Sequence, residues 1–219
     1  MCAFSAVGQF ESDNRMDDCL TKLWLVGNGG GQARESSELA FYFMARHTNI
    51  DCYSKRGKKG YMFLVTDEGG YPHVSASQAG AIFGDRLESD IPLKSIIEEV
   101  RDRFEVFLVY LETGAYGAPA TARIVDEWKE IFGERFLILK DPADVSELIS
   151  TTIGLCEGRE VDSITKDLVA AGTTPGTIKA VTTALVPYAA SAKATGLARA
   201  TVTGNLPAVA GKGGRAKRV

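Results

Sequence analysis

The stretch Gly60–Gly70 limits most strongly what this chain can fold into. It holds the consecutive apolar residues Tyr61–Val65 and ends with a carboxylate pair and two glycines. A short apolar run rich in aromatic and branched side chains is typical of a β-strand buried on both faces, inside a parallel sheet covered by helices. Ligands of such sheets bind in the crevice at the carboxyl ends of the strands. The stretch therefore predicts a buried strand over 60–66 that brings Asp67 and Glu68 to a functional edge.

Strand and helix patterns alternate along the rest of the chain up to residue 155. Besides the strand at 60–66, apolar runs predict strands over 105–111 and 135–139. Apolar residues at helical spacing predict helices over 35–48, 75–83 and 119–132, one that begins at Pro92, and one that begins at Asp141 and Pro142. This alternation indicates right-handed crossover units. We therefore expect a mostly parallel α/β sheet with helices on both faces.

Composition divides the chain into three parts. Residues 1–155 carry the α/β pattern. Residues 156–190 predict a helical C-terminal extension, with helices near 161–171 and 177–189 whose apolar residues are few and small. Residues 191–219 are mainly Ala, Gly, Thr and basic residues, which cannot bury enough apolar surface to offset the entropy of ordering, so we expect a disordered basic tail.

The overall composition excludes several classes of protein. With 45% hydrophobic and 24% charged residues the chain is typical of a soluble globular protein, and its formal charge of −3 gives no reason to expect nucleic acid as a partner. Its 4 cysteines are scattered, which argues against a zinc ribbon or a disulfide framework and favours a reducing compartment. No segment approaches the roughly 18 apolar residues of a membrane span. We expect a cytoplasmic protein without a membrane partner.

Two motifs and their order along the chain resemble the von Willebrand factor type A (VWA) domain. Gly29–Gly31 precede the predicted helix, as in the glycine loop of that family, and Phe63–Asp67 resemble its fourth strand, which ends in a metal-site aspartate. The resemblance covers about residues 3–155. It implies a three-layer, Rossmann-like VWA sheet. The strand that carries the family's Asp-x-Ser-x-Ser motif is lacking, because this motif does not occur in the chain, so the resemblance also implies that the domain is incomplete at its N-terminus.

The resemblance also implies a metal site. In VWA domains a divalent cation, commonly Mg²⁺, is held by the Asp-x-Ser-x-Ser loop, by the glycine loop and by the aspartate of the fourth strand. On this chain the last position is Asp67, and Ser36 is the hydroxyl nearest to the glycine loop, while Gln32 and Glu68 are weaker candidates as metal ligands. Mg²⁺ is typically bound by one or two carboxylates and keeps several waters. The implied Mg²⁺ site is therefore incomplete in this chain.

Three functions follow as hypotheses. The first is a protein–protein interaction module of VWA type, acting through the carboxyl edge of the sheet, with a protein partner that the sequence does not identify. The second is a hydrolase or nucleotide-binding enzyme on a Rossmann-like sheet that uses Asp67 and Glu68, which predicts a deep pocket above the strand ends. The glycine loop has neither of the spacings that cradle nucleotide phosphates. The third is a degenerate remnant without a site.

Overall fold

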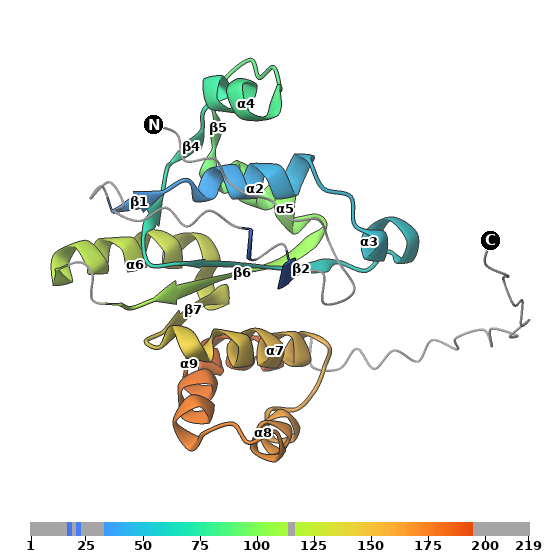
Figure 1. Ribbon diagram of the computed structural model, residues 1–219, viewed down its shortest axis with the longest axis vertical. Helices are drawn as coiled ribbons and strands as arrows, with labels where there is room; N and C mark the ends of the chain where they lie inside the picture. The colour runs from blue at the N-terminus through green and yellow to red at the C-terminus, as the bar shows by residue number, and fades with distance from the viewer. Residues whose placement is uncertain (1–16, 19–20, 23–32, 114–116, 195–219) are drawn as a thin grey trace, which may run out of the picture.

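The computed structural model of the chain describes residues 17–18, 21–22, 33–113 and 117–194 (Figure 1). The helices are α2 (Ser37–Arg46), α3 (Asp51–Arg56), α4 (Ala76–Phe83), α5 (Leu93–Arg101), α6 (Ala118–Phe132), α7 (Val145–Cys156), α8 (Val161–Ala170) and α9 (Pro175–Ala194). The strands are β1 (Arg34–Glu35), β2 (Gly60–Thr66), β3 (Gly69–Gly70), β4 (His73–Val74), β5 (Ile91–Pro92), β6 (Phe104–Leu111) and β7 (Phe136–Leu139). Short 3-10 turns, η1 (Gly133–Arg135) and η2 (Pro142–Asp144), precede β7 and α7.

The main sheet has three parallel strands in the order β2-β6-β7. Gly60 pairs with Phe104 at one end of the β2–β6 ladder and Thr66 with Tyr110 at the other. Helices α4 and α5 lie in the connection from β2 to β6, and α6 lies in the connection from β6 to β7. The mixed α/β class and the parallel sheet are thus confirmed. Because the strands are parallel, their carboxyl ends lie at one edge.

The central strand of this sheet is β6, and β2 is less buried than its sequence predicts. All residues from Val106 to Tyr110 are buried in β6. In β2 only Met62 and Thr66 are buried, and Val65 is 39% exposed. Among the residues that the structure describes, no strand pairs with the second edge of β2. The prediction of a strand buried on both faces was therefore wrong for β2 and describes β6.

Helices pack on both faces of the sheet (Figure 1). Helices α2, α5 and α6 cover one face, where the alternate residues Val106 and Leu108 of β6 join their core. Helices α7 and α9 cover the opposite face, where Phe107 and Val109 of the same strand are buried. This alternation is what a pleated strand with two covered faces requires.

The predicted apolar stripes of the helices have different outcomes. All four stripe residues of α5 are buried: Leu93, Ile96, Ile97 and Val100. The stripe predicted for α6, which included Ala122, was right only in part. Trp128 and Phe132 are buried, but Ala122 is exposed and Ile124 takes the buried place in the first half of the helix. The side chain of Asp141 accepts a hydrogen bond from Ala143 N (2.9 Å) and caps the η2 turn, as predicted.

The stretch predicted as a helical extension contributes to the core. It forms α8 and α9, and Val181 and Leu185 of α9 are buried in the same cluster as Leu137 of β7. Small neighbouring residues such as Ala184 pack against that cluster too. The domain division at residue 155 stays a prediction. Of the tail predicted over 191–219, residues 191–194 form the end of α9, and residues 195–219 lie outside the described residues.

Candidate functional site

Asp67 lies directly after the carboxyl end of β2, as predicted from the sequence. Thr113, two residues beyond the end of β6, donates a hydrogen bond from Oγ1 to Oδ2 of Asp67 (3.2 Å). Asp67 is half-buried and Thr113 is exposed. Two adjacent parallel strands thus each contribute one oxygen-bearing side chain to the same edge, which is where α/β sheets bind ligands.

A second hydroxyl, that of Thr66, organises the turn that follows Asp67. Thr66 is buried, and its Oγ1 donates to Oε2 of Glu35 in β1 (3.0 Å) while it accepts from the backbone N–H of Glu68 (3.1 Å). A threonine hydroxyl offers one donor and two acceptor positions, so this geometry uses both capacities. Thr66 therefore ties β1 to the end of β2 and fixes where the turn begins.

The strands β1 and β3 form a short parallel pair beyond the end of β2, in which Arg34 pairs with Gly69. The backbone N–H of Gly69 donates to the carbonyl of Ala33 (3.1 Å), whose φ is positive at 52°. A positive φ in alanine is sterically unfavourable and is maintained by surrounding contacts. Glu127 of α6 contacts this pair of strands through its ion pair with Arg34.

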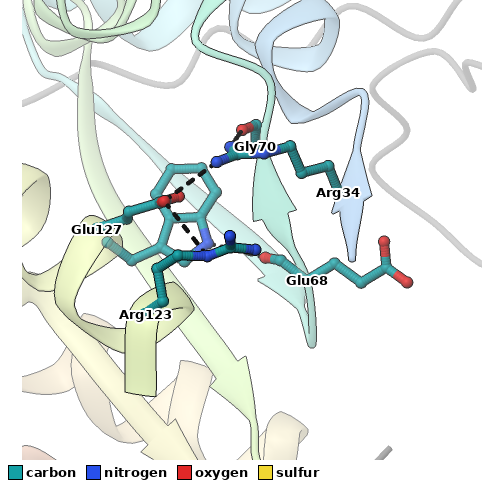
Figure 2. A network of polar contacts seen from close by, with 6 residues as sticks. Arg34, Glu68, Gly70, Arg123 and Glu127 are labelled. Atoms are coloured by element: carbon teal, nitrogen blue, oxygen red, sulfur yellow. Dashed lines mark hydrogen bonds and ion pairs between the residues drawn. The ribbon is translucent and has the colours of Figure 1, made fainter. Parts of the chain in front are cut away.

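Figure 2 shows the polar network around this turn. The guanidinium of Arg34 donates to the carbonyl of Gly70 and forms an ion pair with Glu127 (3.1 Å). Arg123, one helical turn before Glu127, approaches the same carboxylate at 3.9 Å. The side chain of Glu68 extends away from Glu127 and from both arginines (Figure 2). Its carboxylate is therefore directed away from the arginine network.

Trp128 supports the turn that follows Asp67. Its indole Nε1 donates to the carbonyl of Glu68 (2.8 Å), and the ring is almost fully buried. A Cβ added at Gly70 would lie 2.8 Å from Cη2 of Trp128, closer than real Cβ contacts. The absence of a side chain at Gly70 therefore lets the turn approach the indole, and α6 fixes the backbone that follows Asp67.

Two carboxylates lie near the hydroxyl of Tyr110 at this edge. Burial raises the pKa of the Tyr110 hydroxyl above its usual range, and the nearby carboxylates of Asp67 and Glu112 raise that pKa further, although a hydrogen bond with Thr121 opposes them. Carboxylates that disfavour a phenolate favour a cation at the same place. The carboxylates of Asp67 and Glu112 thus contribute negative charge next to Tyr110.

The other predicted ligands have different outcomes. Ser36 is the exposed N-cap residue of α2, next to Glu35, and its side chain makes no capping hydrogen bond. Glu68 joins the site through its backbone N–H and carbonyl, and Gln32 lies outside the described residues. Within the described part of the chain, no hydrogen bond or ion pair joins Ser36 to Asp67, so the pairing of these two residues as metal ligands stays a prediction.

Sequence reasoning missed three side chains of this edge: Glu35, Thr66 and Thr113. Thr113 could have been found, because it carries a hydroxyl and lies two residues after the end of the second predicted buried strand. Thr66 directly precedes Asp67 and carries a hydroxyl. Glu35 has no local signal, since it reaches Thr66 only through the pairing of β1 with β3.

A fit to Mg²⁺ can be judged from the oxygen atoms present. Within the described ranges, no three His, Cys, Asp or Glu side chains are grouped so as to hold a metal ion. Asp67 and Thr113 bring two hard oxygen atoms to one point, and the hydroxyls of Thr113 and Thr66 each donate a hydrogen bond to a carboxylate. This donor set fits an ion that keeps most of its waters, as Mg²⁺ does.

A pocket of about 360 Å³ lies beside the same turn. Its apolar lining consists of Gly70, Pro72, Pro92, Leu93, Trp128 and Ile131. Neither Asp67 nor Glu68 is part of its lining. It is therefore not the pocket above the strand ends that the enzyme hypothesis predicts.

Comparison of the chain with known protein families, with curated proteins and with solved structures finds no match. The residues that the structure describes include no helix with the length and apolar character needed to cross a membrane.

Proposed function

We propose that the chain is a protein–protein interaction module of VWA type, with a three-layer, Rossmann-like sheet, whose partner binds at the edge formed by Asp67 and Thr113. The observation that carries this proposal is the hydrogen bond between these two residues, which brings the carboxyl ends of β2 and β6 to one point. The order of elements supports the same assignment, since a parallel β2-β6-β7 sheet carries helices on both faces.

Mg²⁺ is the cation that we propose for this edge. Asp67 supplies a carboxylate oxygen and Thr113 a hydroxyl oxygen, and the carboxylate of Glu112 lies near the same edge. Water and an acidic side chain of the partner would supply the other ligands, because Mg²⁺ in proteins keeps several waters and is bound through only one or two carboxylates. The chain's own contribution is to hold two oxygens in place through the rigid ends of neighbouring strands.

Titration calorimetry with Mg²⁺ and with Mn²⁺ tests the metal. We expect binding heat with the wild type and none with Asp67→Ala. The matched control is Asp102→Ala, an exposed aspartate just before β6 at the opposite edge, which should leave binding unchanged. Equal heats, or none, for wild type and Asp67→Ala would reject the metal.

The interaction itself has a separate test. Affinity capture with the wild type and with the double variant Asp67→Ala/Thr113→Ala, followed by quantitative mass spectrometry, should show partners that only the wild type retains. If both proteins retain the same partners to the same extent, this edge is not the binding surface. The hydrolase or nucleotide-binding alternative stays a prediction, and no contact at Asp67 or Glu68 favours it.

A further inference from the structure

The pocket beside the turn has an apolar base built from buried residues. Trp128 and Leu93 are almost completely buried, and Gly70 lies against both, since a Cβ at that position would be 2.8 Å from the indole and 3.4 Å from Cδ2 of Leu93. Partly exposed Ile131 continues the apolar surface outward. Pockets with mainly apolar lining and a few polar groups are typical ligand sites, and a volume near 360 Å³ is at the small end of their range of about 300–1,000 Å³.

The polar part of the lining consists of two ion pairs. Arg34 pairs with Glu127 at 3.1 Å, and Lys94 pairs with Glu130 at 2.5 Å. Both acids belong to α6, whereas the cations belong to β1 and α5. The pocket therefore receives its acids from one element and its cations from two others, each acid is in contact with one of these cations, and the four charges sum to zero.

The ion pair between Lys94 and Glu130 can be replaced by contacts of either side chain with a ligand. The side chains of Lys94 and Glu130 are 61% and 71% exposed. Ion pairs this exposed contribute little to stability, so a ligand can take over either partner at small cost. Arg34 and Glu127 are less exposed, and Arg34 also donates to the carbonyl of Gly70, so we expect this pair to stay formed and to direct the ligand.

We propose that this pocket binds a free amino acid with an apolar side chain. The ligand's ammonium group faces Glu127 and Glu130, its carboxylate faces Lys94 and Arg34, and its side chain packs on the partly exposed apolar lining at Ile131. A ligand with only one charge would pair with the acids or with the cations and leave the other groups without a counter-charge. A zwitterion with an apolar side chain matches the acids, the cations and the apolar lining at once.

The site is independent of the proposed interaction edge, because Asp67 and Thr113 are not part of its lining. The two proposals can fail separately. Metal binding at Asp67 is measured by calorimetry with Mg²⁺, whereas ligand binding in the pocket is measured by calorimetry with amino acids in the absence of metal.

Five probes dissect the recognition: L-phenylalanine, L-leucine, N-acetyl-L-phenylalanine without the ammonium, phenethylamine without the carboxylate, and glycine without the side chain. We expect at least one of the two apolar amino acids to bind and each truncated probe to bind about tenfold more weakly or not at all, because each loses one charge-assisted contact or the apolar contact. Titration calorimetry and thermal shift on the full chain give the affinities.

Substitution of Lys94 and of Glu130 tests whether these two side chains contact the ligand. Lys94→Met and Glu130→Gln should each weaken binding of the amino acid several-fold while leaving the unfolding transition unchanged, since both side chains are exposed. Lys55→Met is the matched control, an equally exposed lysine of α3 that pairs with Asp51, and it should bind like the wild type. Absence of binding by both amino acids at millimolar concentration overturns the proposal. Equal affinity for the zwitterions and the singly charged probes also overturns it.

Discussion

At the scale of single residues, Glu38 is the most unusual group in the described chain. It lies in the first turn of α2, its side chain is 1% exposed, and neither carboxylate oxygen has a hydrogen-bond partner within bonding geometry. Burial raises the pKa of this carboxyl from 4.5 to about 7, although the backbone N–H groups of Glu38 and Tyr71 lower it in part. A buried carboxyl without a counter-charge is more stable in its neutral form. Glu38 thus makes the α2–β3 contact sensitive to pH.

The stability of the fold should therefore fall as pH rises through this range. The folded state binds the proton more tightly than the unfolded state, so the penalty for ionising Glu38 is absent below pH 4.5, grows with pH, and is complete above about 7. The shift corresponds to at most about 3 kcal/mol of unfolding free energy. Urea unfolding followed by circular dichroism at several pH values should show a steeper decline for the wild type than for Glu38→Gln.

The control for this prediction is Glu88→Gln, which changes an exposed carboxyl in the loop after α4. This variant should reproduce the wild-type dependence on pH. Parallel profiles for wild type and Glu38→Gln would show that Glu38 does not titrate in this range.

At the scale of elements, α6 fixes the turn between β2 and β3. Trp128 binds the carbonyl of Glu68, and Glu127 holds the guanidinium that binds the carbonyl of Gly70. One helix thus fixes two successive points of the backbone that leaves Asp67. The position of Asp67 depends on this packing as well as on β2, so a change at the helix–turn contact should affect both stability and metal binding.

Gly70→Ala tests this contact. The added methyl group would lie 2.8 Å from the indole of Trp128, so the ring or the turn must move, and overpacking of this kind costs about 1–3 kcal/mol. We expect a corresponding loss of unfolding free energy in urea and weaker binding of Mg²⁺. Gly176→Ala in α9 is the control, because its Cβ would meet no atom closer than 3.6 Å and alanine favours a helix. Equal stability of Gly70→Ala and wild type would mean that the turn is not fixed by Trp128.

At the scale of the whole molecule, features that depend on neighbouring residues in the sequence could be predicted, whereas features that depend on how distant segments pack could not. The α5 stripe could be predicted because its residues repeat within one helix, and Asp67 could be placed because it comes two residues after the end of an apolar run. The exposure of Val65 could not, since it depends on which strand lies at the centre of the sheet. The pair Arg34–Glu127 joins residues 93 positions apart, and no local pattern connects them.

The role of α9 shows the same limit and yields the last prediction. Its apolar residues are few, yet Val181 and Leu185 close the face of the sheet opposite α2 and α5. If α9 is part of this core, Leu185→Ala should cost about 2–5 kcal/mol of unfolding free energy, because it leaves a cavity against the sheet. The next residue provides the matched control: Val186 is 62% exposed, whereas Leu185 is 3% exposed, so Val186→Ala should change stability by less than about 0.5 kcal/mol. Urea unfolding of both variants measures the difference.

Equal and small effects would mean that residues 156–190 form an extension that does not stabilise the sheet. A large effect of Leu185→Ala alone would place the end of the α/β domain beyond α9, because the second face of the sheet is then closed by residues that lie after position 155.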